Sequence, residues 1–434
     1  MTSTGTARIR DKPLVRKLTG LYQRTRQARW AMISQVVTSG ANFATTVILV
    51  RALGLEDFGR FSICFLLTMI VRNFLNGIVL MPMSTIAPKL HGISTPAYRG
   101  FLALNVFAFG IGSSALLAAI AVPLGGLINA PWLADIMLPL AIANLTAVFA
   151  DYMRRYHFVY EAPAAACGVD TVRFAFQLAL LVAFAYLWTG TMTPASALYA
   201  LAGGAIAGAA FGLLFHGGVK WSNRLAASVW PRHWNFIKWM TPGYALDAVQ
   251  HNAPLFLGSA ILGESALGLV RAMQQLANAL NLPLNALQQI APSLAASSYK
   301  KGGHAALKKF LFVMTGSSVA FVMVCAALTF LLSHIVVGIL FKVPVAEANP
   351  ILFTYFVVNI LILIRLPLII KMQSIEKPAH ITASSTIGSM TAILFSFVFI
   401  HFYNSKGIPL AAIAALMANI IYYYFLSIRT RLKN

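Results

Sequence analysis

Four arginines lie inside long hydrophobic stretches of the sequence: Arg72, Arg173, Arg271 and Arg365. A charge at the centre of a bilayer costs about 2.5–3.5 kcal/mol on insertion scales, so such a residue must face protein or a water-filled cavity. Arg173 follows Asp170 by three residues, which predicts a local helical ion pair. Asp151 precedes Arg154 by the same step and is interpreted in the same way. Arg72 and Arg365 have no acidic residue within one helical turn.

Polar residues at helical spacing accompany these arginines. One stripe contains Arg271, Gln275, Asn278, Asn281, Asn285 and Gln288. Steps of three and four residues place them on one face of a helix. A stripe that faces lipid is untenable, so it either joins helices in a dry bundle or lines a hydrated cavity. We favour the cavity, and we expect Asn76, beside Arg72, and Asn42, in the first hydrophobic stretch, to line it too.

A space lined by Arg72, Arg271 and Arg365 is net positive and predicts an anionic cargo. The planar guanidinium group binds phosphate through two parallel hydrogen bonds, and the low dielectric of a membrane interior strengthens the attraction. Asparagine and glutamine amides hydrogen-bond to hydroxyl groups. These residue types together predict a substrate that combines phosphate and sugar.

Asp247 and His251 lie one helical turn apart and are candidate ion-coupling residues. Asp247 is the one deep acid that lacks a local basic partner. A carboxyl group in a membrane cavity tends to have a raised pKa, which suits coupling to a proton gradient. Equally, Asp247 can neutralise one of the buried arginines, and the sequence leaves both interpretations open.

The elements that must position these side chains are membrane helices. Of the 434 residues 59% are hydrophobic and only 10% are charged, and the mean hydropathy is +0.75. A soluble domain is about 25% charged. Backbone polar groups in lipid must pair internally, so apolar runs of about 20 residues are helices. We expect an all-α membrane protein of about twelve transmembrane helices, near 31–50, 61–86, 100–128, 135–158, 166–188, 195–216, 236–262, 265–297, 306–332, 349–370, 379–402 and 408–428.

The basic residues fix the expected orientation. The net charge is +22, and on the predicted topology only four basic residues, Arg51, Arg60, Lys342 and Lys406, lie on the side opposite the termini. The positive-inside rule therefore places both termini in the cytoplasm, and the charge is no sign of nucleic-acid binding. The expected organisation is a basic cytoplasmic arm (1–29), a six-helix lobe (30–216), a cytoplasmic linker (217–235), a second six-helix lobe (236–428) and a cytoplasmic tail (429–434).

The two halves repeat one short pattern. Leu53-Gly54 followed by Gly59 recurs as Leu262-Gly263 followed by Gly268, at an offset of 209 residues. An even number of helices per half predicts parallel repeats, related by a pseudo-two-fold axis along the membrane normal, with the substrate site between them near the midplane. The alternative is that glycine and proline simply gather in membrane turns. The three cysteines have no spacing typical of a metal or disulfide framework, and we expect no metal or cofactor.

Residues 51–61, Arg-Ala-Leu-Gly-Leu-Glu-Asp-Phe-Gly-Arg-Phe, close a first helix rich in Ser, Gln, Thr and Asn. This stretch resembles the start of the polysaccharide transporter family, the Wzx-like lipid-linked oligosaccharide flippases of the multidrug/oligosaccharidyl-lipid/polysaccharide exporter superfamily. Ile339-Leu340-Phe341 with 346–352 resembles the link after the family's ninth helix, although position 342 is Lys where Gly is expected.

The resemblance implies two lobes that form a V and open alternately to each side of a bacterial inner membrane. It also implies an undecaprenyl-pyrophosphate-linked repeat unit as cargo, for O-antigen, capsule or exopolysaccharide assembly. The chain would then be a transporter rather than an enzyme, a monomer in contact with membrane lipids, with a polysaccharide polymerase and chain-length proteins as candidate partners.

Two other functions fit a twelve-helix chain. A cation-coupled multidrug antiporter of the same superfamily needs a cavity rich in acids, and this sequence has few. A membrane-embedded polysaccharide polymerase or glycosyltransferase usually carries a long outer loop with catalytic residues, whereas every outer connection here is short. The basic signature of the major-facilitator transporters between helices two and three is missing from 89–94.

Overall fold

The computed structural model describes residues 13–90, 94–127, 131–188, 192–279, 282–374 and 378–431. The long helices in this part of the chain are α1 (Pro13–Leu75), α3 (Ser94–Leu127), α4 (Met137–Val159), α5 (Pro163–Val182), α6 (Pro194–Leu214), α7 (Asn223–Leu262), α8 (Glu264–Ala279), α9 (Leu282–Leu331), α10 (Val345–Ser374), α11 (Pro378–Tyr403) and α12 (Gly407–Arg431). A short α2 (Met81–Ile86) follows α1 after a π-helical segment, Asn76–Leu80.

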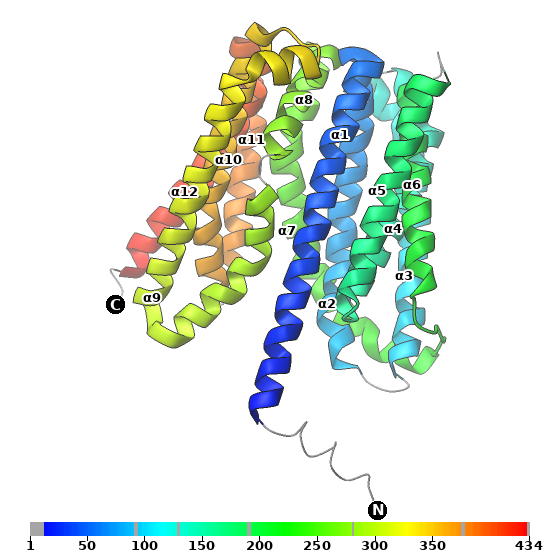
Figure 1. The fold of residues 1–434 in the computed structure, drawn as a ribbon, viewed down its shortest axis with the longest axis vertical. Coiled ribbons are helices and arrows are strands. Elements are labelled where there is room, and N and C mark those ends of the chain that lie inside the picture. The colour runs from blue at the N-terminus through cyan, green and yellow to red at the C-terminus, as the bar shows by residue number, and fades with distance from the viewer. Residues whose placement is uncertain are drawn as a thin grey trace, which may run out of the picture.

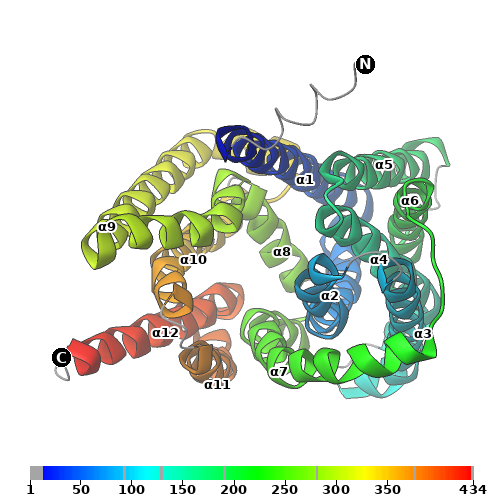
Figure 2. The same ribbon diagram turned by 90° about the horizontal axis from the view of Figure 1, so that it is seen from below.

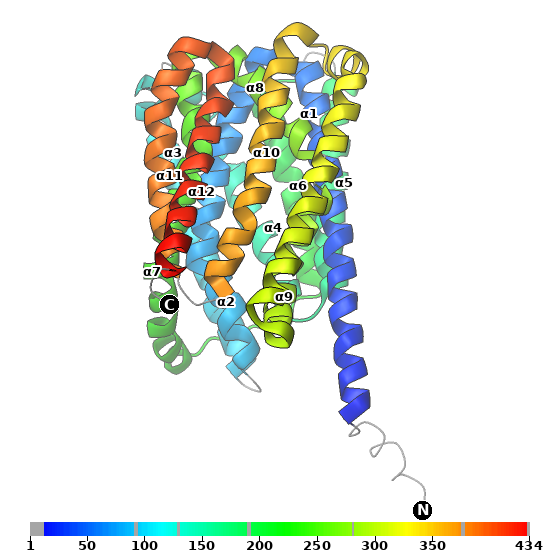
Figure 3. The same ribbon diagram turned by 90° about the vertical axis from the view of Figure 1, so that its left-hand side faces the viewer.

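The helices stand roughly parallel in two groups (Figure 1). Helices α3–α6 form one side of the bundle and α9–α12 the other, while α1, α7 and α8 lie between them, as the view from below also shows (Figure 2). From the side of the second group, α9–α12 form one wall (Figure 3). The prediction of an all-α membrane protein with two lobes is therefore confirmed. We call the group with α3–α6 the N-lobe and the group with α9–α12 the C-lobe.

Two helix breaks have the same backbone conformation. Gly54 interrupts α1 with φ 75° and ψ 179°, and Gly263 separates α7 from α8 with φ 86° and ψ 175°. Positive φ is readily available only to glycine, which explains why both repeats carry it. The breaks turn the chain back into the bilayer, so α1 supplies two membrane-spanning segments.

The second glycine of each repeat joins the lobes. A Cβ atom on Gly59 would overlap the backbone oxygen of Glu264, and a Cβ on Gly268 would overlap the backbone oxygen of Leu55. The two contacts are reciprocal at the offset of 209 residues that relates the repeats, as a pseudo-two-fold axis between them requires. We call this contact the glycine crossing; it lies at the upper end of the bundle in Figure 1.

Two further contacts join the first repeat to the second. The indole Nε1 of Trp132 donates to Glu264 Oε1 over 2.7 Å; within the first repeat, the guanidinium of Arg60 lies 5.9 Å from the centre of the same Trp132 ring. Phe43 meets Phe341 edge to face with ring centroids 6.0 Å apart. Aromatic pairs of this geometry stabilise packing beyond their buried area, so the upper end holds the lobes together firmly.

The segments expected as an arm and a linker are partly helical. Residues 13–29 continue upward as the first part of α1, and residues 223–235 form the start of α7. Ser222 caps α7, because its Oγ accepts a hydrogen bond from the Leu225 amide over 3.3 Å. The start of α7 is fixed to the N-lobe by His233, which is buried and whose Nε2 lies 2.8 Å from the Tyr98 hydroxyl of α3.

The glycine crossing predicts that Gly268→Ala destabilises the protein. The added methyl group must push apart two backbones, and overpacking of this kind costs about 1–3 kcal/mol. We expect a lower midpoint of thermal unfolding for the purified protein in detergent. Gly316→Ala is the matched control, since a Cβ there meets open space and alanine is the better helix former. Equal midpoints for the two variants would contradict the close crossing.

His233 predicts an acid-sensitive attachment of α7. Burial lowers its pKa from the ordinary 6.5 to about 4, so the folded state favours the neutral ring. The stabilisation is complete above pH 6.5, and on the order of 3 kcal/mol is lost as the pH falls from 6.5 to about 4. We expect the thermal midpoint to fall over this range more steeply in the natural protein than in His233→Gln, which cannot titrate. Parallel pH profiles would show that another group is responsible.

Candidate functional site

A cavity of about 330 Å³ lies between α1, α5 and α8, and we call it the central cavity. Its polar lining consists of Thr38, Asn42, Thr45, Thr46, Ser62, Arg72, Asn73, Asn76, Arg173, Gln177, Arg271 and Gln275. Phe58, Phe61, Phe65 and Phe174 form much of its apolar wall. Residues from both lobes meet here, because α8 belongs to the second repeat and α1 and α5 to the first.

Five of the residues predicted to bind substrate line this cavity: Asn42, Arg72, Asn76, Arg271 and Gln275. Asn278 and His251 line a second, smaller cavity on the C-lobe side. Arg365 and Asp247 line neither of the two cavities. Asn281 lies outside the described residues, as do the side chains of Asn285 and Gln288.

Asp151 holds two of the cavity arginines. Its Oδ2 lies 2.5 Å from Arg72 Nε, and its Oδ1 lies 2.9 Å from Arg173 Nη1. Arg72 has no acid within one helical turn, and its partner instead comes from α4, 79 positions along the chain. One carboxylate shared by two guanidinium groups leaves this cluster with one net positive charge.

The ion pairs of α4 and α5 are exchanged relative to the prediction. Asp151 of α4 pairs with Arg173 of α5, and Arg154 of α4 pairs with Asp170 of α5 through Nε over 2.7 Å. Ser34 also donates to Asp170. Helical spacing permits the local pairs, but the two helices pack side by side, so each acid reaches the arginine of its neighbour instead.

Arg271 brings a positive charge without a carboxylate. Its side chain is only 7% exposed, and its Nη1 donates to Gln274 Oε1 over 2.5 Å. No acidic side chain of the described residues forms an ion pair with it, and its Nε has no hydrogen-bond partner among them. A buried guanidinium with a free donor is prepared to bind an anion.

Arg365 does not join the other arginines. It is buried at 7% exposure in α10 and lies within electrostatic range of Tyr423 on α12. Asn359 of the same helix lines the smaller cavity, and a step of six residues turns a helix by about 240°. Arg365 therefore does not share the face that Asn359 presents, and its role in binding substrate stays a prediction.

Asp247 and His251 lie together as their spacing predicts. His251 Nδ1 is 3.6 Å from Asp247 Oδ1 and 2.8 Å from the backbone oxygen of Asp247. Both side chains are nearly half exposed. Among the described residues, no arginine forms an ion pair with Asp247, and the role of Asp247 and His251 in ion coupling stays a prediction.

Sequence reasoning missed Arg173 as a cavity residue, because the nearby Asp170 offered a local explanation. A count of charges indicates this: the hydrophobic stretches of the first half contain Arg72, Arg154, Arg155 and Arg173 but only Asp151 and Asp170 as acids. Two arginines must therefore share a carboxylate or lack one. Among the described residues, Asp151 is the carboxylate that pairs with arginines of the central cavity, namely Arg72 and Arg173, so the cavity is electropositive.

No protein-family model matches the chain, and no curated protein matches it. Solved structures do. The lipid II flippase MurJ in an inward closed conformation is similar with a TM-score of 0.72 at 12% identity, over 93% of this chain and 87% of that one. An inward-facing multidrug resistance MATE family transporter gives a TM-score of 0.68 at 10% identity, over 94% and 95%. A MOP superfamily transporter from Pyrococcus furiosus, described as having a binding pocket of reverse polarity, gives 0.67 at 15% identity over 100% and 99%.

These likenesses define the class of the fold. The chain is a multi-pass membrane protein with the architecture of multidrug/oligosaccharidyl-lipid/polysaccharide (MOP) superfamily transporters. The solved structures that it resembles are those of transporters and a flippase rather than enzymes.

The shared carboxylate predicts a strong effect of Asp151→Asn. The change leaves two buried guanidinium groups facing each other, and breaking a buried ion pair by removing one partner costs about 3–5 kcal/mol. We expect a large drop in the thermal midpoint of the purified protein, with part of it recovered in Asp151→Asn/Arg173→Gln, which removes the repulsion. A double variant no more stable than the single one would refute the proposed sharing.

Proposed function

We propose that this protein is a flippase that moves an undecaprenyl-pyrophosphate-linked oligosaccharide repeat unit across a bacterial inner membrane for surface polysaccharide assembly. The observation that carries the proposal is the charge of the central cavity: Arg72, Arg173 and Arg271 line it, and Asp151 is the carboxylate that directly opposes them. Such a cavity attracts a pyrophosphate and repels a cation.

The chemistry of the lining supports an anionic, hydroxyl-rich headgroup. Arg271 lacks a carboxylate partner and so offers its guanidinium to a phosphate oxygen. Asn42, Asn73, Asn76, Gln177 and Gln275 add amides at hydrogen-bonding positions. A multidrug antiporter of the same fold needs to stabilise organic cations, which the excess of guanidinium groups opposes.

The orientation follows from the basic residues, which place both termini in the cytoplasm by the positive-inside rule. The flippase loads cargo from the inner leaflet and releases it outside by rocking the lobes, while the polyprenyl tail stays in lipid. Asp247 and His251 are the candidate ion-coupling pair, since they contact each other and His251 also reaches the smaller cavity. The protein acts as a monomer, with a polysaccharide polymerase and chain-length proteins as partners that receive the product.

Replacing Arg271 tests the proposal. In proteoliposomes that contain the purified protein, we expect Arg271→Gln to reduce flipping of an undecaprenyl-pyrophosphoryl sugar by about 10- to 100-fold, because a hydrogen bond to a charged group contributes about 1.5–3 kcal/mol. Arg232→Gln, which removes an exposed arginine at the start of α7, serves as the control and should flip normally. Unchanged flipping by Arg271→Gln, or transport of ethidium by the natural protein, would contradict the proposal.

A further inference from the structure

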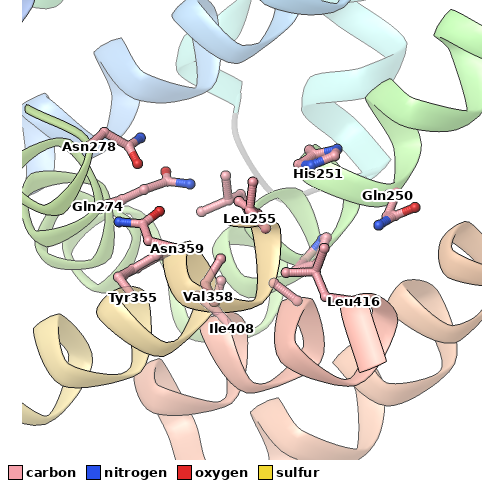
Figure 4. A pocket seen from close by; sticks show the side chains of 13 residues that line it. Gln250, His251, Leu255, Gln274, Asn278, Tyr355, Val358, Asn359, Ile408 and Leu416 are labelled. Carbon is pink, nitrogen blue, oxygen red and sulfur yellow. The ribbon is translucent and has the colours of Figure 1, made fainter. Parts of the chain in front are cut away.

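The smaller cavity, which we call the C-lobe pocket, has a volume of about 140 Å³ and lies between α7, α8, α10 and α12. Its polar side chains form two groups (Figure 4). Gln274, Asn278 and Asn359 come from α8 and α10, and Gln250 and His251 come from α7. Leu255, Val358, Ile408 and Leu416 form the apolar surface between these groups.

The lining of the C-lobe pocket carries amides but no Asp, Glu, Lys or Arg among the described residues. It therefore differs from the central cavity, where three guanidinium groups gather. Each amide can both donate and accept hydrogen bonds, as a sugar hydroxyl can. The apolar surface between the amides suits the C–H face of a sugar ring. The pocket is thus matched to an uncharged ligand with hydroxyl groups.

Gln250 is a buried amide of this lining and is only 2% exposed. Its Oε1 faces Gly388 of α11, because a Cβ atom on that glycine would overlap the oxygen. The amides that a ligand in the pocket would meet are therefore those of Gln274, Asn278 and Asn359.

The two cavities meet along α8. Arg271 and Gln275 line the central cavity, whereas Gln274 and Asn278 line the C-lobe pocket. Arg271 Nη1 donates to Gln274 Oε1 over 2.5 Å, so an arginine of the central cavity directly contacts an amide of the C-lobe pocket. The two cavities are therefore neighbours on either side of α8.

We propose that the C-lobe pocket is the subsite for the sugar ring attached to the pyrophosphate, while the central cavity holds the pyrophosphate itself. This inference rests on the proposed flippase function. The pocket is about half the size of the smallest pockets that hold drug-sized ligands, which begin near 300 Å³. A pocket of this size has room for one sugar ring. The subsite therefore binds the first sugar, and the rest of the repeat unit lies outside it.

Binding to the purified full-length protein in detergent tests the subsite. The probes are undecaprenyl pyrophosphate and the same lipid carrying one glucose, galactose, N-acetylglucosamine or N-acetylgalactosamine. For the natural protein, we expect at least one sugar to tighten binding by about three- to tenfold over the sugar-free lipid, as one hydrogen bond would. Asn359→Leu should lose this gain and keep its affinity for the sugar-free lipid.

Asn349→Leu is the matched control, because Asn349 lies on the same helix outside both cavities and reaches Ser333 at 3.5 Å. If Asn359→Leu does not fold, Asn278→Leu replaces it, since that side chain is exposed in the pocket. Tight binding of the sugar-free lipid with no gain from any sugar, or a gain that survives in both pocket variants, overturns the subsite alone. Failure of the natural protein to bind the sugar-free lipid overturns the proposed function instead.

Discussion

A charged side chain inside a bilayer must either pair with an opposite charge of the protein or face a ligand or water. This constraint determines how the centre of the protein is arranged. Asp151 and Asp170 compensate three of the arginines in the N-lobe, with Asp151 shared between Arg72 and Arg173. Arg271 remains without a carboxylate and lies on the opposite wall of the same cavity. The polar residues of α1, α5 and α8 surround these charges, and together they form the electropositive cavity.

The pairs between α4 and α5 lie inside the N-lobe. Each pair joins two helices of the same lobe, so neither would have to break in the proposed rocking of the lobes. Arg271 comes from the other repeat, so its distance from the Asp151 cluster depends on how the lobes are arranged. An anion held between them would therefore sense, and help to set, the relative position of the two lobes.

Much of the fold follows from the sequence, and less of the site does. Hydrophobic stretches predicted the helices, and the recurring glycines indicated a repeat. The structure places Gly54 and Gly263 at helix breaks with positive φ, and Gly59 and Gly268 at the close contact between the repeats. Arg72 was predicted to line a cavity because it has no acid within one helical turn, and Arg271 because it begins a polar helical stripe. Their partners were not predicted, because contacts such as Arg72 with Asp151 depend on how helices pack. Arg365 looked equivalent to Arg271, since no nearby residue reveals which way α10 faces.

The start of α7 was expected to be a linker, because its exposed surface lacks a regular apolar face.

In the proposed rocking of the lobes, the glycine crossing would be the pivot. Backbone atoms meet directly there, so no flexible side chain can absorb a displacement. The helices on either side of the contact would therefore tilt as rigid bodies. From Gly59 to Lys89 the chain runs about 30 residues, or about 45 Å at 1.5 Å per residue. A tilt of about 10° at the crossing would move the far end of this arm by about 8 Å. A tilt too small to disturb the packing at the glycine crossing would thus open a gap between the helices at the opposite membrane surface.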